Sequence, residues 1–209
     1  MRFKLFSRVL IVVAAAAMTF FSPMSTAQGA DKYLEISPAQ PTEPGKTEVL
    51  EFFAYSCPHC AVLEPLFAKW TKALPQDVVV RQVPVAFNAS MRPQQQLFYA
   101  LEAMNRMDLH PLVFQAIHEQ KKRMFTKADI VAWVVDQGVD KAKFEAAFDS
   151  FGVTSKTARA DQLTTVYKLQ GTPSIAVAGR YLTSPSEAGG YQETIDVADS
   201  LVRKVRTTK

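Results

Sequence analysis

Hydrophobic and polar positions divide this chain into two β-rich parts separated by a long helical part. An apolar run of β-formers over residues 48–54, with glycine upstream and Ser56 downstream, is typical of a buried strand. Helical spacing of apolar residues follows over 59–74, and a second run of β-formers covers 77–87. A strand, a helix and a strand of these lengths predict a βαβ unit with parallel strands and a right-handed crossover.

The middle of the chain has only helical spacing. It predicts helices over residues 90–107, 111–120, 126–136, 140–150 and 155–169. Thr126 and Asp140 are expected N-caps, and Gly138, Gly152 and Gly171 are expected to follow helix ends. This part of the chain therefore predicts an all-helical insertion.

Strand patterns return after the helices. Residues 174–178 and 180–183, separated by one glycine, predict a strand pair, and a helix over 193–205 closes the chain. A further short strand is expected near 33–36, within a proline-rich lead-in. The β parts are expected to form one sheet.

The predicted fold class is therefore α/β. One sheet-containing domain is expected over residues 28–87 and 158–209, and a helical insertion domain over 88–157.

The first 27 residues have the pattern of a secretory signal peptide. Three basic residues and no acidic one precede an unbroken apolar run over residues 9–17, and small residues at 25–27 provide a cleavage site. The alternative is a membrane anchor. Even extended to residue 21 the run has 13 residues, against the ~20 that span a bilayer. We therefore expect an exported protein.

The charge balance does not predict a nucleic-acid partner. The formal net charge is +4, but three of the 24 basic residues lie in the leading segment, and 21 basic residues remain against 20 acidic ones. The rest of the chain therefore has no strong basic excess. Its 48% hydrophobic and 21% charged residues are typical of a globular protein.

Cys57 and Cys60 are the two cysteines of the chain. In an oxidising compartment they can form a disulfide, but a structural disulfide stabilises mainly by closing a long loop. Since this loop is nearly the shortest possible, the pair is predicted to carry chemistry. A zinc site with His110 and His118 is an alternative, but their separation of eight does not fit zinc spacing. We expect both histidines at the surface, and neither a metal nor another cofactor.

The position of Cys57 favours a thiolate. Pro58 suits the first turn of a helix, so Cys57 is expected at the helix N-terminus, where backbone N–H groups are free. Lowering a pKa by three units requires about 4 kcal/mol, whereas the helix dipole supplies only ~0.3–2 kcal/mol. The backbone N–H groups of His59 and Cys60 are expected to supply the rest, with the His59 ring as an additional polar neighbour. A stabilised thiolate makes the disulfide form an oxidant.

Two further elements each allow two interpretations. At 100° per residue, Glu64 shares a helix face with Cys57 and Cys60, so it is either a half-buried carboxylate that accepts or releases the proton of the Cys60 thiol or an exposed helical glutamate. Pro173, which follows Thr172, is either a simple strand start or a cis-proline.

Taken together, these motifs resemble the DsbA family of bacterial periplasmic disulfide oxidases. The resemblance rests on Cys57-Pro58-His59-Cys60 after a phenylalanine-rich strand, Glu64 four residues later, the helical insertion, and Gly171-Thr172-Pro173 before a hairpin. It implies a thioredoxin fold with an inserted all-helical domain. Cys57 would then be the exposed nucleophile and Cys60 the buried resolving thiol, and Pro173 would be cis and face them.

The resemblance also implies partners and a location. The protein would be a periplasmic monomer that donates its disulfide to newly exported proteins through a mixed disulfide at Cys57. A DsbB-like quinone-linked membrane protein would reoxidise the pair. Apart from the resemblance, we expect extended substrate segments to dock at Thr172 and Pro173 by backbone pairing, because many different unfolded chains must be accepted.

Two departures from the family concern the redox tuning. Thr172 stands where valine is usual, and Arg81 and Gln82 are offered where a buried lysine commonly pairs with the helix glutamate. The rival function is a reductase or isomerase with the same fold. Isomerases of this group usually carry a preceding dimerisation domain, for which the roughly thirty residues between Ala27 and Cys57 leave no room.

Overall fold

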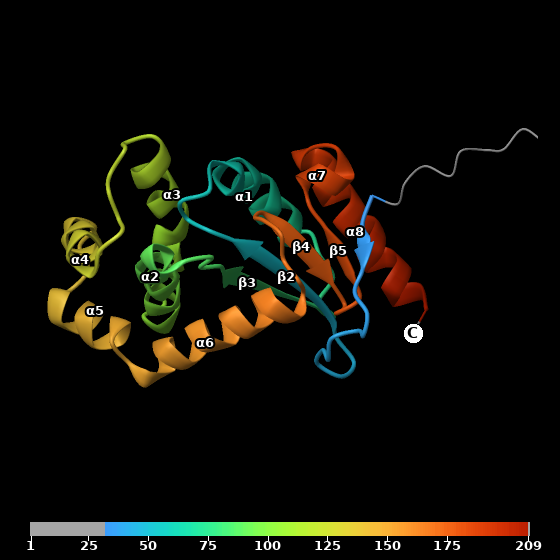
Figure 1. Ribbon diagram of the computed structural model, residues 1–209, viewed down its shortest axis with the longest axis horizontal. Helices are drawn as coiled ribbons and strands as arrows, with labels where there is room; N and C mark the ends of the chain where they lie inside the picture. The colour runs from blue at the N-terminus through green and yellow to red at the C-terminus, as the bar shows by residue number, and fades with distance from the viewer. Residues whose placement is uncertain (1–31, 209) are drawn as a thin grey trace, which may run out of the picture. The chain divides into compact units, whose positions relative to one another are not determined.

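A mixed five-stranded sheet organises the computed structural model, which describes residues 32–208 (Figure 1). The strands are β1 (Leu34–Glu35), β2 (Thr47–Phe53), β3 (Val78–Pro84), β4 (Ser174–Val177) and β5 (Tyr181–Thr183). Their order in the sheet is β1-β5-β4-β2-β3, and β2 pairs in parallel with β3 while the other neighbours are antiparallel. The predicted βαβ unit, the strand pair and the short first strand are confirmed.

Strand β2 lies at the centre of the core. All seven of its residues are buried, as its apolar run predicts for a strand covered on both faces. On one face it packs with α1 (Pro58–Thr71) and α8 (Tyr191–Thr207), through a cluster that includes Val49, Leu63 and Ile195. The strand therefore holds Cys57 and the start of α1 on a rigid support.

The predicted helical insertion lies between β3 and β4 in the chain (Figure 1). Its helices are α2 (Arg92–Ala103), α3 (His110–His118), α4 (Lys127–Asp136), α5 (Lys141–Phe148) and α6 (Phe151–Val166), with 3₁₀ turns at Ala89–Met91 and Met107–Leu109. A second core cluster joins these helices to the sheet and includes Phe52, Phe53, Leu97, Phe98 and Val113. The insertion and the active-site end of β2 thus share one core.

Helix caps are confirmed in part. Thr126 and Asp140 are N-caps whose side chains accept backbone N–H bonds, and Gly138, with φ +77°, follows α4. Gly152 was expected to end a helix, and this is wrong. It lies in the first turn of α6, which begins after the N-cap Ser150, four residues before the predicted start.

The last part of the chain differs from the prediction in detail. Helix α6 ends at Val166 and not near Gly171, and Lys168 follows with a positive φ of 51°. A short helix, α7 (Pro185–Ala188), was not predicted, and α8 begins two residues earlier than expected.

Two expectations remain outside what the structure tests. The predicted signal peptide lies outside the described residues, and the domain boundaries stay a prediction, since residue 158 lies within α6. Among residues 32–208, no helix combines the length and apolarity that a bilayer span requires.

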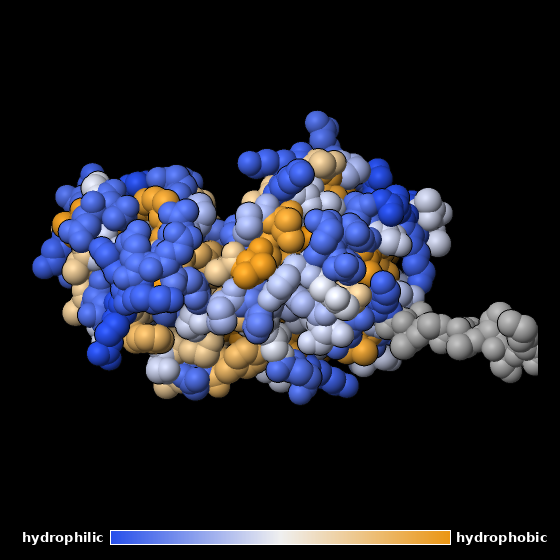
Figure 2. Space-filling view, turned by 90° about the horizontal axis from the view of Figure 1, so that it is seen from above, coloured by the Kyte–Doolittle hydropathy of each residue, from blue (hydrophilic) through white to orange (hydrophobic). Residues whose placement is uncertain are grey.

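Figure 2 shows a face of the molecule that is mostly hydrophilic, with hydrophobic residues gathered near its middle, between the helical insertion and the sheet part. Such a group of apolar residues on an otherwise polar face is a candidate contact surface.

Candidate active site

Cys57 is the N-cap of α1, and Pro58 is the first helical residue. Cys57 thus lies at the helix N-terminus, as the sequence predicts. The Cys57 backbone is extended (φ −84°, ψ 116°), and its carbonyl accepts the N–H groups of Cys60 at 3.2 Å and Ala61 at 3.3 Å. The half-buried Cys57 thiol therefore lies at the N-terminus of α1, while Cys60 is only 1% exposed.

The two thiols have opposite acidities. A hydrogen bond from the Cys60 thiol is the largest cause that lowers the pKa of Cys57 to about 5; burial opposes it, and the Thr172 side chain and the backbone of Cys60 and His59 lower it further. Burial, reinforced by the neighbouring Cys57, raises the pKa of Cys60 well above its ordinary value. At neutral pH the reduced pair therefore holds a Cys57 thiolate beside a Cys60 thiol. The backbone donors were predicted, whereas the dominant Cys60 donor was not.

The His59 ring turns toward Tyr191 at the start of α8. Its Nδ1 lies 2.6 Å from the Tyr191 hydroxyl, and the two rings stack with centroids 6.2 Å apart. The ring expected to act on Cys57 is thus held by a partner 132 residues away in the chain. Sequence reasoning missed Tyr191, and no local signal marks it.

The peptide bond between Thr172 and Pro173 is cis, which confirms the second interpretation of this proline. A further cis bond, Ser37-Pro38, was not predicted. The Thr172 carbonyl lies 3.3 Å from the Cys57 sulfur and can accept its thiol hydrogen. The predicted residues of the two motifs therefore meet at one site.

A cavity of about 650 Å³ opens beside this site. His59, Thr172, Pro173 and Tyr191 line its end at the cysteine pair, and the rest is lined mainly by residues of β1, of the segment 167–171 and of the stretch 182–190. It is a groove next to reactive sulfur, large enough for an extended peptide segment.

Glu64 is buried, so its interpretation as an exposed helical glutamate is wrong, while its role toward the proton of Cys60 stays a prediction. It meets Glu51 of β2 at Gln82 of β3, whose amide nitrogen donates to Glu51 at 2.8 Å and to Glu64 at 3.1 Å. Burial, followed by the charge of Glu64, raises the pKa of Glu51 to about 8. Oε1 of Glu51 is buried and has no hydrogen-bond partner among the described residues. We call the two carboxyl groups of Glu51 and Glu64, together with the Gln82 amide that links them, the buried acid cluster.

The expected surface position of His110 is wrong, because its side chain is buried and joins this cluster. Its Nε2 lies 3.3 Å from Glu64, and its Nδ1 lies 2.7 Å from the Tyr55 hydroxyl. His118 is half-buried, and its Nε2 contacts the Tyr55 carbonyl at 2.7 Å. Both histidines of α3 therefore hold Tyr55, two residues before Cys57.

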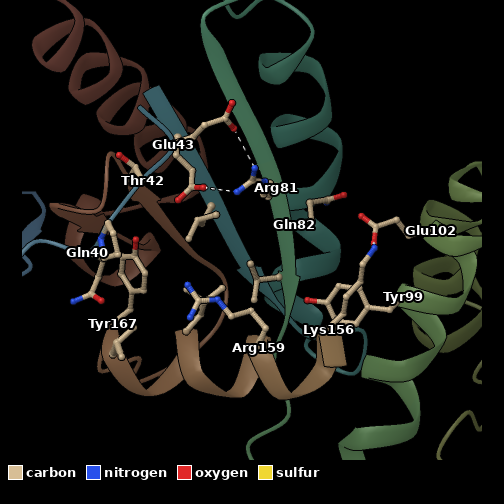
Figure 3. Close-up of a pocket in the computed structure, with 16 residues that line it drawn as sticks. Gln40, Thr42, Glu43, Arg81, Gln82, Tyr99, Glu102, Lys156, Arg159 and Tyr167 are labelled. Atoms are coloured by element: carbon tan, nitrogen blue, oxygen red, sulfur yellow. Dashed lines mark hydrogen bonds and ion pairs between the residues drawn. The ribbon is translucent and has the colours of Figure 1, made fainter. Parts of the chain in front are cut away.

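Arg81 and Gln82 take opposite directions from β3, as successive strand residues do. Arg81 lines a cavity of about 560 Å³ and pairs with Glu43 and Glu48. Figure 3 shows the Arg81 side chain directed toward Glu43. Gln82 turns its amide to Glu51 and Glu64. Where the family pattern expects a buried lysine, this chain therefore places a neutral amide.

Comparisons with known proteins agree with this geometry. The sequence model of the DSBA-like thioredoxin domain matches residues 90–192. The chain is 52% identical to the thiol:disulfide interchange protein DsbA of Bordetella parapertussis, over 96% of this chain and 97% of that one. It is 36% identical to DsbA of Pseudomonas aeruginosa, over 95% and 97%.

Solved structures give the same result. The crystal structure of Pseudomonas aeruginosa DsbA superposes with a TM-score of 0.82 at 36% identity, covering 85% of this chain and 94% of that one. Reduced DsbA1 of Neisseria meningitidis gives a TM-score of 0.76 at 28% identity, covering 89% and 98%. The fold is thus a thioredoxin fold with a helical insertion. The chain belongs to the DsbA family of thiol:disulfide interchange proteins.

Proposed function

We propose that this thiol–disulfide oxidoreductase works as an oxidase, which donates its Cys57–Cys60 disulfide to newly exported proteins. The observation that carries the proposal is the pKa of about 5 for Cys57, beside a Cys60 whose pKa is raised. A sulfur that is stable as a thiolate is a good leaving group, so the dithiol form is favoured and the disulfide is readily given away.

The reaction runs through a mixed disulfide at Cys57. A substrate thiolate attacks the Cys57 sulfur, the Cys57–Cys60 bond breaks, and Cys60 leaves and takes up a proton. A second substrate thiolate then attacks the substrate sulfur of the mixed disulfide, and Cys57 leaves as a thiolate. The substrate loses two electrons and the protein gains them. Attack at Cys57 is favoured because Cys60 is buried.

The buried acid cluster is proposed to supply the proton that Cys60 takes up. Glu64 lies on the same helix as Cys60, and Glu51, with its pKa of about 8, holds a proton at neutral pH. Burial of Cys60 makes an unprotonated sulfur costly, so a nearby proton donor favours its departure.

Substrate segments are proposed to dock at Thr172 and Pro173. Many different unfolded chains must be accepted, and pairing of extended backbones achieves this without side-chain pockets for one sequence. The groove beside these residues offers room for such a segment next to the Cys57 sulfur. His59 and Pro58 lie at the same end of α1 and are proposed to tune the pair.

The family also suggests the cellular setting. We infer a periplasmic monomer that a DsbB-like quinone-linked membrane protein reoxidises and that has no nucleic-acid partner. The signal-peptide pattern of the leading segment supports export, and the absence of a strong basic excess in the rest of the sequence supports the last point.

Equilibration with glutathione tests the proposal. We expect the Cys57–Cys60 disulfide to be reduced almost completely at glutathione ratios that leave an ordinary structural disulfide intact, because the thiolate stabilises the dithiol form. The fraction reduced can be followed by alkylation of free thiols. A pair that stays oxidised under these conditions points to a reductase and contradicts the proposal.

Replacing Tyr191 with phenylalanine is expected to lower the pKa of Cys57 further, by roughly half a unit to one unit. The variant removes the hydroxyl that holds the His59 ring, so the ring becomes free to turn to the thiolate, and a hydrogen bond contributes about 0.5–1.5 kcal/mol. Thiolate absorbance as a function of pH measures the change. A matched His59→Ser/Tyr191→Phe variant controls for effects that bypass the ring. An unchanged titration in Tyr191→Phe would show that the hydroxyl has no influence on the pair.

A further inference from the structure

His110 occupies an unusual place for a histidine. It begins α3 in the helical insertion, yet only 3% of it is exposed. Its ring packs edge-to-face against Phe53, Phe98 and Phe114, with centroids 5.2, 5.5 and 5.4 Å away. In such an apolar place a polar ring must find hydrogen-bond partners for both nitrogens.

The contacts of His110 fix which nitrogen carries the hydrogen. The two amide hydrogens of Gln82 are used by Glu51 and Glu64, so its 3.2 Å contact with Nε2 is not a third bond. The Tyr55 hydroxyl donates to Nδ1, which leaves the ring hydrogen on Nε2, and Nε2 faces the Glu64 carboxylate at 3.3 Å. Burial raises the pKa of Tyr55 well above its ordinary value, so the phenol keeps its hydrogen for this bond.

We propose that His110 is a positioning residue for the two carboxyl groups of the buried acid cluster. It keeps the negative charge on Glu64 and the exchangeable proton on Glu51. Two neighbouring carboxylates do not both ionise readily, and the one with more donors ionises first. Glu64 receives a hydrogen from Gln82 and faces the His110 Nε2 at 3.3 Å, whereas Glu51 receives one hydrogen from Gln82 and its Oε1 receives none. The inference rests on the proposed function, in which this proton goes to Cys60.

The surroundings of His110 contain few other charges. The titratable groups that face it are Glu64 of α1 and Tyr55, with Glu51 of β2 across Gln82, while α2 presents the ring of Phe98. An imidazole ring and an amide thus stand in this cluster where a fixed cation could stand.

A cavity of about 330 Å³ adjoins the cluster, lined by Glu64 and Gln82 and by the charged residues Lys72, Arg81 and Glu102. It gives water a route to Glu64, by which a proton given to Cys60 can be replaced from solvent.

The test uses His110→Phe, which keeps the ring but cannot donate. Carboxyl ¹³C chemical shifts of Glu51 and Glu64 in the reduced protein report where the proton lies at each pH. We expect the wild type to hold it on Glu51. In the variant we expect the proton to be shared between Glu51 and Glu64. The midpoint of the carboxyl titration of the two residues should rise by roughly one to two pH units, as expected when a buried charge loses a polar partner. The pH profile of dithiol oxidation should move in the same direction.

Two further variants separate positioning from a structural role. In a Glu64→Gln background, adding His110→Phe should no longer move the pH profile, because His110 acts through Glu64. His118→Gln is the matched control, since His118 lies on the same helix but contacts the Tyr55 carbonyl and not the buried acid cluster. It should leave the carboxyl titration unchanged.

If His110→Phe does not fold, Tyr55→Phe removes the hydroxyl that fixes Nδ1, and a smaller shift in the same direction is expected. The inference is overturned if Glu64 holds the proton in the wild type, if a folded variant titrates like the wild type, or if the shift persists in Glu64→Gln. The proposed function fails separately, if the wild type does not oxidise dithiols at all.

Discussion

Replacing Cys57 with serine is expected to abolish disulfide exchange, lowering its rate on the order of a thousandfold or more, whereas Cys60→Ser should accumulate mixed disulfides. The reason is the different accessibility of the two sulfurs, since Cys57 is half-buried at the helix start and Cys60 is only 1% exposed. Without Cys60 no internal thiol can displace a bound partner, so adducts at Cys57 persist. Non-reducing electrophoresis and the mass of the adduct measure both effects.

The double variant Cys57→Ser/Cys60→Ser is the control, because it offers no thiol and should form no adduct. Adducts on Cys60 in the Cys57→Ser variant, formed as fast as those on Cys57 in Cys60→Ser, would reverse the roles assigned to the two residues.

Local signals made the core of the fold and the reactive pair predictable. The apolar run of β2 needs cover on both faces wherever it lies, and a proline directly after Cys57 places a helix start there. These features depend on residues a few positions apart. The start of α6 was harder, because Gly152 in its first turn resembles a helix end and Phe151 is exposed, although Ser150 is a suitable N-cap.

The residues that surround the cysteine pair and the buried acid cluster could not be predicted from the sequence, because they meet only in the folded chain. Tyr55 and His110 are 55 residues apart, and His59 and Tyr191 are 132 apart. A histidine considered alone is most often at the surface, and only the folded chain shows that Tyr55, Glu64 and three phenylalanines converge on His110. Glu51 did carry a signal, since a carboxylate inside a fully buried strand must be either paired or protonated.

The free energy of unfolding of the reduced protein, taken relative to that of the oxidised protein, is expected to rise by about 1–2 kcal/mol between pH 4 and pH 7. In the reduced protein the pKa of Cys57 is lowered to about 5, against ~8.5 for a cysteine in an unfolded chain. A lowered pKa stabilises the folded state above the unfolded value, and this stabilisation is lost as pH falls through 5. Two pH units correspond to ~2.7 kcal/mol, and solvent screening at the half-exposed thiol reduces this.

Urea unfolding of both redox forms across this pH range measures the difference. Contributions from Glu51 and the other carboxylates are present in both forms and largely cancel, and Cys60 stays protonated below pH 8 because burial raises its pKa. Cys57→Ser is the control. When it takes the place of the reduced wild type in the comparison, its stability relative to the oxidised wild type should not rise with pH. A difference that stays flat from pH 4 to pH 8 would mean that the fold does not stabilise the thiolate. By linkage, the free energy that stabilises the reduced form is the same free energy that drives disulfide donation. The pH dependence of stability therefore reports the oxidising power of the pair without any substrate.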